Sequence, residues 1–473
     1  MQVRVVETSF RTRSVQTRLP FKFGMQVLQS VRLAELAVLV ENPNGERMTG
    51  RASDLLVPKW FEKNPDTTSE EDATALAESV EAAASIATLL GSTAGAHPVF
   101  ELWSVIHAEQ VGACDHRNSD ALVRGFGVAM VERALIDATT RLAGCSFNTA
   151  LRSGMLGFNP RRLVGEAAGW SPDRLPDPPT SIEVRHTIGM LDPLTAGDIQ
   201  PGERIHDGLP QSLEEDIDAY GVRCFKIKVC GDEDADRERL RDIARVSSAH
   251  VGPDARFTLD GNEQCRDLEA FAGMLETLAA DPEVGPLVER LELIEQPLPR
   301  RETFDPEANT ALDRLARIAP VIIDEADTDG DAFRRAIELG YAGTSIKACK
   351  GVFRAIANRA LIDVRRDAGA THLFQSAEDL TNLGSIPLQQ DLALQATLGM
   401  DNAERNGHHY FRGLDHLPET TRHELATALP GLYVEDGSTT RLRIDSGRLD
   451  LTGVVDGVGL GGHLGSFQQE EAS

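Results

Sequence analysis

Residues 224–229 read CFKIKV, and four more short apolar runs follow: FTLDGN at 257–262, LELIEQP at 291–297, VIIDEA at 321–326 and SIKACKG at 345–351. Each run has the length and the β-branched or aromatic content of a buried strand, and a stretch with helical spacing follows each one. Strands that alternate with helices favour parallel pairing. These runs therefore predict consecutive βα units of one sheet.

The same rhythm extends to both sides of these five runs. The eight strand candidates are 182–188, 224–229, 257–259, 291–294, 321–323, 344–349, 372–374 and 408–411. They recur at roughly the 25–40 residues of a βα unit. Eight units predict an α/β fold, a closed (β/α)₈ barrel of the TIM type, over residues 181–414.

The flanks of the predicted barrel follow other patterns. Residues 1–180 combine a strand candidate at Leu33–Glu41 with helices predicted over Ser69–Leu90 and Asp120–Leu142, which indicates an α+β domain. The proline-rich stretch SPDRLPDPP at 171–179 marks its end. Residues 415–473 carry β-like pieces at 439–444 and 449–451. We expect this segment to return to the N-terminal domain, with its last few residues disordered.

Composition narrows the class of partner. The chain has 473 residues and a net charge of −26, and an acidic surface of this kind repels nucleic acids and anionic membranes. No run reaches the roughly 20 apolar residues of a membrane span, and Met1 to Arg13 lacks the apolar core of a secretory signal. The six cysteines form no CxxC pair, which predicts free thiols in a reducing cytoplasm.

Ionisable residues end five successive predicted strands. In strand order they are Lys228, Asp260, Glu295, Asp324 and Lys350. In a parallel barrel these ends converge on one face, where the active site lies. Three oxygen ligands suit Mg²⁺, with Mn²⁺ possible, and a partly desolvated lysine beside a cation has its pKa lowered toward the range useful for proton transfer. The series predicts a metal site between two lysines.

The motifs FKIKV, TLDGNE, LIEQPL, IIDEA and SIKACKG resemble, in order, those of the enolase superfamily, specifically its mandelate racemase/muconate lactonizing enzyme family. LPFKFG at 19–24 is similar to that family's first capping-domain loop, and VERALIDATTRLAG at 131–144 to the helix that leads into its barrel. The resemblance implies a capping domain, built from residues 1–180 and 415–473, over the barrel. Lysines on both faces resemble the muconate lactonizing subgroup.

The resemblance also implies roles for residues. Asp260, Glu295 and Asp324 would hold the metal, and Lys228 and Lys350 would act as acid and base on opposite faces. Lys226 would help to neutralise a substrate carboxylate, and Lys347 is the less favoured choice for the second base. Residues expected behind the ligands or against the substrate are Asn262, Glu325, Lys347, Ser376, Glu378, Arg412, Lys22 and Phe23. His186, on the first strand, is interpreted as a core histidine.

The implied substrate is a small carboxylate that loses its α-proton to give a metal-stabilised enolate, in a racemase, epimerase or cycloisomerase. Two alternatives stay open. One is an acid-sugar or hydroxy-acid dehydratase of the same superfamily, although its usual seventh-strand histidine is not evident. The other is a Schiff-base lyase on a barrel lysine, for which three aligned carboxylates have no use. Members of the family usually assemble from dimers, so a homo-oligomer is expected.

Overall fold

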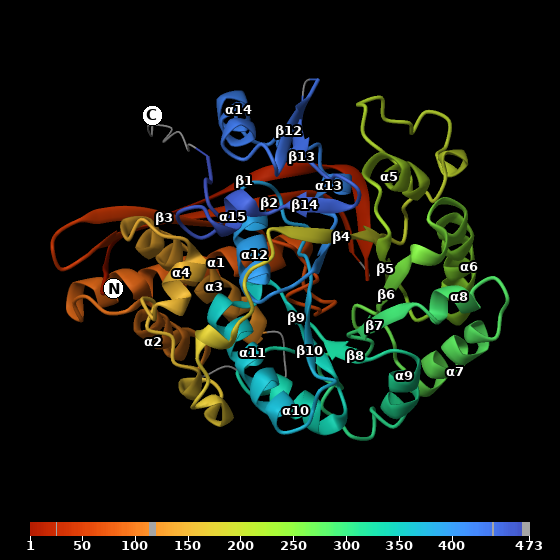
Figure 1. Cartoon of the computed structure of the whole chain (residues 1–473), viewed down its shortest axis with the longest axis horizontal. Coiled ribbons are helices and arrows are strands. Elements are labelled where there is room, and N and C mark those ends of the chain that lie inside the picture. Colours follow the sequence, from red (N-terminus) through yellow and green to blue (C-terminus); the bar gives the residue numbers. More distant parts are fainter. Residues whose placement is uncertain (25, 113–119, 438, 466–473) are drawn as a thin grey trace.

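The computed structural model describes residues 1–24, 26–112, 120–437 and 439–465. An N-terminal antiparallel sheet with helices, a ring of parallel strands and a C-terminal segment make up the fold (Figure 1). The expectation of disorder at the end of the chain concerns residues 466–473, which lie outside the described residues, as does Cys114.

The N-terminal part is an antiparallel sheet covered by helices. The strands pair in the order β1-β2-β3, and α1 and α3 pack on the sheet and on each other. The strand predicted at 33–41 and the helices predicted at 69–90 and 120–142 are confirmed. The elements are β1 (Arg4–Phe23), β2 (Gln26–Glu41), β3 (Arg47–Leu55), α1 (Ser69–Thr93), α2 (Val99–Val111), α3 (Asp120–Leu142) and α4 (Phe147–Arg152).

Helix α1 is an exception to the expectation that no segment is long and apolar enough to span a membrane. By length and composition alone it is apolar enough to do so. In the structure its face that carries Leu76, Val80 and Ala87 is buried, and the helix packs against α3 and β1. It begins with a capping box formed by Thr68 and Glu71. This packing is that of a core helix in a globular domain.

Eight parallel strands form the predicted α/β barrel, which is confirmed. The strands are β4 (Ser181–Ile188), β5 (Cys224–Lys228), β6 (Arg256–Asp260), β7 (Leu291–Glu295), β8 (Val321–Ile323), β9 (Gly343–Ile346), β10 (Phe374–Ala377) and β11 (Asn402–Arg405). The connecting helices are α5 (Leu213–Tyr220), α6 (Glu233–His250), α7 (Leu268–Ala279), α8 (Gly285–Val288), α9 (Leu312–Ile318), α10 (Ala332–Leu339), α11 (Val352–Asp367) and α12 (Ile386–Thr397). Each strand lies beside its sequence neighbour, and β11 returns to β4.

The barrel has a seam where a fully closed ladder was expected. Among the described strands, hydrogen-bonded pairing runs from β10 round to β11 but does not join these two. Side chains bridge the gap instead. The Asp379 amide donates to Glu404 Oε2 at 2.9 Å, and the Asn406 amide donates to Asp379 Oδ2 at 3.1 Å. The strands β10 and β11 are thus held together by carboxylates.

The eighth strand was predicted in the wrong place. Residues 408–411 do not form a strand, because Gly407–Tyr410 is a short helix, α13, and the strand is Asn402–Arg405. Ala403 is the only apolar residue of β11, and its Glu404 and Arg405 are buried through charge pairing, so no hydrophobic pattern reveals it. Smaller shifts affect the sixth and seventh strands. The sixth ends at Ile346 because Ala348–Lys350 forms a 3₁₀ turn, and the seventh begins only at Phe374.

The C-terminal segment packs on both other parts. Its elements are α14 (Glu419–Ala428), β12 (Tyr433–Asp436), β13 (Thr439–Leu442), β14 (Arg448–Asp450) and α15 (Thr452–Val455). Strand β14 pairs antiparallel with β4. Further on, the Leu460 amide donates to Asp137 Oδ1 at 3.0 Å, and Arg141 Nη2 donates to the Gly462 carbonyl at 2.7 Å. The segment therefore reaches α3 in the N-terminal part.

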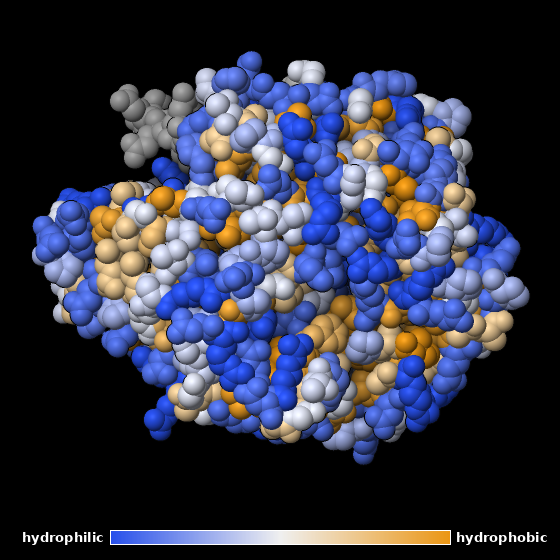
Figure 2. Space-filling view, viewed as in Figure 1, coloured by the Kyte–Doolittle hydropathy of each residue, from blue (hydrophilic) through white to orange (hydrophobic). Residues whose placement is uncertain are grey.

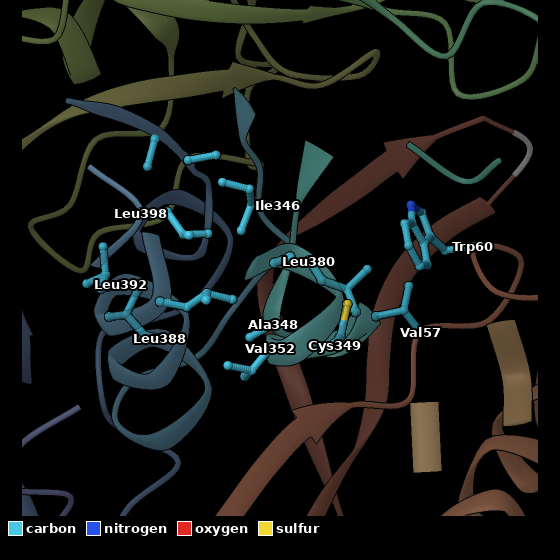
Figure 3. Packing of buried hydrophobic residues seen from close by; sticks show 14 of the residues in the cluster. Val57, Trp60, Ile346, Ala348, Cys349, Val352, Leu380, Leu388, Leu392 and Leu398 are labelled. Atoms are coloured by element: carbon cyan, nitrogen blue, oxygen red, sulfur yellow. The ribbon is translucent and has the colours of Figure 1, made fainter. Parts of the chain in front are cut away.

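A shared apolar core joins the N-terminal part to the barrel. Figure 3 shows Val57 and Trp60, which follow β3, on one side and Leu388 and Leu392 of α12 on the other, with Cys349 between them. These side chains are almost completely buried. The visible face of the molecule is mainly hydrophilic, as the composition predicts (Figure 2). The loop after β3 is thereby fixed near the end of β9.

Candidate active site

The register of the parallel strands brings the predicted site residues together. Lys228 of β5 pairs with Asp260 of β6, and Asp260 pairs with Glu295 of β7. Asp324 follows β8, and Lys347 follows β9. Because paired residues of parallel strands lie side by side, these groups meet at the carboxyl ends of the strands. The structure thus brings the predicted ligands into one buried cluster.

Lys226 lies at the centre of four carboxylates. Its amine is 3.0 Å from Asp260 Oδ2 and 2.6 Å from Glu295 Oε2, and it donates to Glu378 Oε2 at 2.7 Å and to Glu404 Oε2 at 2.9 Å. The side chain is fully buried. Burial alone would lower the pKa of Lys226, but Asp260 and Glu295 raise it well above the ordinary value. Lys226 is therefore a fixed positive charge among the carboxylates.

Two other lysines flank this cluster. The Lys228 amine donates to Asp260 Oδ2 at 2.5 Å, and the Lys347 amine donates to Asp324 Oδ2 at 2.5 Å. Strands β5 and β9 lie on either side of β6, β7 and β8. Burial would lower the pKa of Lys347, but Asp324 and Glu295 raise it. The cluster thus has one amine on each side.

Lys350 is held in a different way. It lies in the 3₁₀ turn after β9, and its amine donates to the Asp324 carbonyl at 3.0 Å, to Asp324 Oδ1 at 3.2 Å and to Ser345 Oγ at 2.7 Å. Asp327 Oδ2 lies 3.6 Å away. These partners bind the amine to the backbone and side chains around Asp324.

Glu295 carries the signature of a cation site. It is fully buried, and neither oxygen accepts an aligned hydrogen bond, although the Lys226 amine lies close. Burial, Asp260 and Glu378 raise its pKa well above the ordinary value. Buried oxygens normally have partners, and a hard dication is the partner that several convergent carboxylates favour. Asp260, Glu295 and Asp324 are thus buried oxygen donors of the kind that a magnesium ion requires, but among the described residues their oxygens are not a group within 4.8 Å of one another.

Asn262 and Glu325 lie directly behind the predicted ligands. The Asn262 amide donates to Asp260 Oδ1 at 2.9 Å, and its Nδ2 donates to Glu325 Oε1 at 3.4 Å. Burial, with Asp324 and Glu263 nearby, raises the pKa of Glu325 to about 7. The structure thus connects Asn262 to Asp260 and to Glu325, the residue after Asp324.

The other side of the cluster contains predicted and missed residues. Ser376 and Glu378, both predicted, hydrogen-bond to each other and to the buried guanidinium of Arg185. Arg185 and Glu404 were missed. Glu404 was missed because the eighth strand was predicted in the wrong place. Arg185 was missed because only the alternation of side chains along β4 shows that it faces the barrel interior. Thr187, two residues further along β4, faces the same way and donates to Glu404.

The N-terminal part covers the cluster. The Lys347 amine lies 4.6 Å from the centre of the Trp60 ring, and the Lys63 amine donates to the Asn262 carbonyl at 3.2 Å. Arg300, buried and paired with Glu263, donates to the carbonyls of residues 60 and 61 at 2.7 and 2.8 Å. These contacts dock the loop after β3 on the barrel mouth.

The remaining predicted residues lie at the edge of the site. Phe23 is buried at the end of β1, with its ring centre 5.2 Å from that of Phe21, and the Lys22 carbonyl accepts from the Met190 amide at 3.4 Å. Arg412 pairs with Asp415 at 3.1 Å and is 41% exposed. None of these contacts involves the carboxylate cluster.

The comparison with protein families is decisive. Residues 209–449, just over half of the chain, match the family model described as enolase C-terminal domain-like. The chain belongs to the enolase superfamily. It is thus an enzyme of the isomerase or lyase type, and this membership supports a racemase, epimerase or cycloisomerase. No curated protein matches the chain.

Solved structures of superfamily members share the fold. A Bradyrhizobium enolase complexed with magnesium and mandelic acid matches with a TM-score of 0.60 at 17% identity, over 98% of this chain and 96% of its own. A dipeptide epimerase from Enterococcus faecalis V583, complexed with Mg and L-Leu-L-Tyr, gives 0.61 at 14%, over 97% and 99%. A 2-chloromuconate cycloisomerase from Rhodococcus opacus 1CP gives 0.60 at 16%, over 97% and 95%.

Proposed function

We propose that this enzyme is a Mg²⁺-dependent racemase, epimerase or cycloisomerase that removes the proton next to a substrate carboxylate, with Lys228 and Lys347 as its acid and base. The observation that carries the proposal is the pair of amines on opposite sides of a buried carboxylate cluster. A proton can then leave one face of a substrate and return to the other.

Asp260, Glu295 and Asp324 would hold the cation. When bound, Mg²⁺ would supply electrostatic stabilisation of the negative charge that develops on the substrate carboxylate as the proton leaves. Glu295 supports this assignment, because its buried oxygens lack aligned donors. Asn262 and Glu325 would hold Asp260 and the neighbourhood of Asp324 in position.

The choice of Lys347 over Lys350 rests on their partners. Among the described residues, the Lys347 amine contacts the acidic cluster and the face of Trp60 alone, whereas the Lys350 amine donates to three oxygens, one of them a backbone carbonyl. A base must give up its protein partner to reach a substrate, and fewer partners make this easier. Lys350 would then position Asp324.

A bound cation would also lower the pKa of Lys347. Asp324 and Glu295 now raise the pKa of Lys347. Once their charge is shared with a cation, that effect weakens, and burial lowers the pKa toward the range of a working base. Lys226 would keep its contacts with Glu378 and Glu404 and balance their charge.

A carboxylate substrate agrees with the relatives. Solved superfamily members hold mandelic acid, an L-Leu-L-Tyr dipeptide and, in a Mycobacterium smegmatis enolase, tartrate. All three ligands are carboxylates with a hydrogen on the adjacent carbon. We therefore propose hydroxy acids, N-acyl amino acids and dipeptides as the first substrates to test.

Exchange of the α-hydrogen in D₂O, followed by NMR with this substrate panel, tests the proposal. We expect exchange with Mg²⁺ and its loss in EDTA. Lys228→Ala and Lys347→Ala should each abolish exchange from one enantiomer and slow turnover by about 10²–10⁴-fold, the usual contribution of a general base. Exchange that survives chelation, or that neither substitution changes, would reject the proposal.

Lys350→Met is the matched variant for the base assignment. It should lower activity with both enantiomers equally, because a residue that positions Asp324 serves both faces. Loss of exchange with one enantiomer only, in Lys350→Met but not in Lys347→Ala, would return the role of base to Lys350.

A further inference from the structure

A second cluster of ionisable side chains lies outside the barrel interior. It contains His186 of β4, Asp216 of α5, and His408 and His409 of α13, all buried. Residues 185 and 187, which flank His186, contact Glu378 and Glu404 inside the barrel, so His186 points the other way, toward α5. Strand β4 and helices α5 and α13 can be located in Figure 1.

The atoms of this cluster are close together. His186 Nδ1 lies 3.1 Å from His408 Nε2, and His186 Nε2 lies 3.8 Å from Asp216 Oδ2. One ligand atom from each of these three residues can be chosen so that all lie within 4.8 Å of one another. His409 Nδ1 approaches Asp216 Oδ2 from another side at 2.8 Å. The three side chains converge as ligands of one ion do.

Several of these buried atoms lack a hydrogen-bonding partner. Within the described part of the chain, Asp216 Oδ1 and His408 Nδ1 have no hydrogen-bonding partner, whereas Asp216 Oδ2 lies 2.8 Å from His409 Nδ1. Buried polar atoms without partners call for an explanation, such as an ion.

We propose that His186, Asp216 and His408 form a second metal site, for a divalent transition ion of the Zn²⁺ type. Imidazole nitrogens favour zinc, copper and nickel, whereas Mg²⁺ favours oxygen ligands, so this site differs in chemistry from the carboxylate cluster. Zinc bonds of about 2.0–2.1 Å require these three side chains to draw closer together around the ion. His409 holds the Asp216 carboxylate from the other side.

The site joins three parts of the fold beside the hairpin formed by β1 and β2. Its ligands come from the first barrel strand, the helix α5 and the helix that follows the last strand. Helix α13 also supports the hairpin, since the ring of Tyr410 stacks on Phe21 at 4.1 Å and Arg18 Nη1 donates to the His409 carbonyl at 3.3 Å. A pocket lined by Tyr220, Arg441 and His408, among others, borders the site. An ion bound by His408 would hold α13 in place, and α13 in turn supports β1 of the hairpin.

Equilibrium dialysis of the untagged, full-length protein against Zn²⁺, with excess Mg²⁺, tests this site. We expect one zinc per chain that remains in Asp260→Asn, a variant of the carboxylate cluster. The double variant Asp216→Asn/His408→Gln should lose this zinc, whereas His372→Gln, which changes an exposed histidine, should keep it. Zinc retained by the double variant would overturn the proposal.

Diffraction from the wild type makes the test independent of how the variants fold. Crystals grown with Zn²⁺ should show an anomalous peak at the zinc edge between His186, Asp216 and His408. Zinc found only at the carboxylate cluster, or no zinc bound at all, would overturn the proposal. This result does not depend on the catalytic role proposed for Lys228 and Lys347.

Discussion

The amine of Lys347 lies over the ring of Trp60, 4.6 Å from its centre, so that a residue from the N-terminal part covers an amine at the end of a barrel strand. A buried cation–π contact contributes up to about 2 kcal/mol. We expect Trp60→Leu to slow exchange on the Lys347 face by about 2- to 30-fold and to change the Lys228 face less. Isotope exchange measured with each enantiomer gives the ratio of the exchange rates on the two faces.

The control for this variant is Trp103→Leu, which removes another buried tryptophan, one that stacks on Phe100 in α2. It should lower the melting temperature without changing the ratio between the two faces. Equal loss on both faces in Trp60→Leu would mean that Trp60 acts only through packing.

Substitutions of Arg300 and of its neighbour Arg301 distinguish the effect of docking the loop after β3 from the effect of a lost surface charge. Arg300 is buried against Glu263 and the loop after β3, whereas Arg301 is exposed. Because breaking a buried ion pair typically costs about 3–5 kcal/mol, we expect Arg300→Met to lower stability strongly and to raise KM more than it lowers kcat. Arg301→Met should change neither. Thermal unfolding measures the stability of the two variants, and steady-state kinetics measures their KM and kcat. Equal stability and equal kinetics of Arg300→Met and Arg301→Met would contradict the docking role of Arg300.

Glu132 makes stability depend on pH. It is buried in α3, accepts from the Phe353 amide in the first turn of α11 at 2.6 Å, and burial raises its pKa from 4.5 to about 7. The folded protein therefore binds this proton more tightly than the unfolded chain, so its contribution to stability is present below pH 4.5 and is lost as the pH rises to about 7.

We expect Glu132→Gln to remove this contribution, which amounts to a few kcal/mol at most, about 1.4 kcal/mol per pKa unit. Urea midpoints measured over that pH range should fall less steeply for Glu132→Gln than for the wild type. Glu81→Gln, on the exposed face of α1, should leave the slope unchanged. Parallel profiles for Glu132→Gln and the wild type would show that the carboxyl is not protonated on folding.

One of the two missed residues, Glu404, belongs to the carboxylate cluster around Lys226. It accepts from Lys226, Thr187 and the Asp379 amide, and so it holds both the central lysine and the seam of the barrel. In Glu404→Gln an amide group would face the Lys226 amine in place of a carboxylate oxygen. Changes behind metal ligands typically cost 10–100-fold in affinity, so about that increase in the Mg²⁺ concentration for half-maximal exchange is expected.

A titration of exchange with Mg²⁺ measures this shift. Glu419→Gln, at the exposed start of α14, should titrate as the wild type does. An unchanged midpoint in Glu404→Gln would place Glu404 outside the metal-binding network.

The sequence predicted those parts of the fold that depend on hydrophobic pattern. Five strands that end in or just before Lys228, Asp260, Glu295, Asp324 and the lysines near 350 could be recognised because each is a mainly apolar run with a charged residue at its end. Strand β11 could not, because Glu404 and Arg405 are buried by ion pairing, which leaves no apolar signal. The roles of Lys347 and Lys350 could not be separated either, since a 3₁₀ turn after Ile346 redirects the second lysine.

The histidine cluster shows the same limit in another form. His186 was interpreted as a core residue, and its burial agrees with this. Its neighbours Asp216 and His408 lie 30 or more residues away along the chain and approach it only after α5 and α13 have packed. Spacing along the sequence carries no trace of such a meeting.

The contact between α3 and the C-terminal segment constrains how this enzyme can be made. Arg141 and Gly462 are 321 residues apart in sequence, and Asp137 finds its partner Leu460 across a similar distance. During synthesis the helix leaves the ribosome long before the residues that complete its surroundings, while the whole barrel is still to come. Asp137 therefore lacks its contact with Leu460 until residues 460–462 have been synthesised, and the N-terminal part completes its packing only after that.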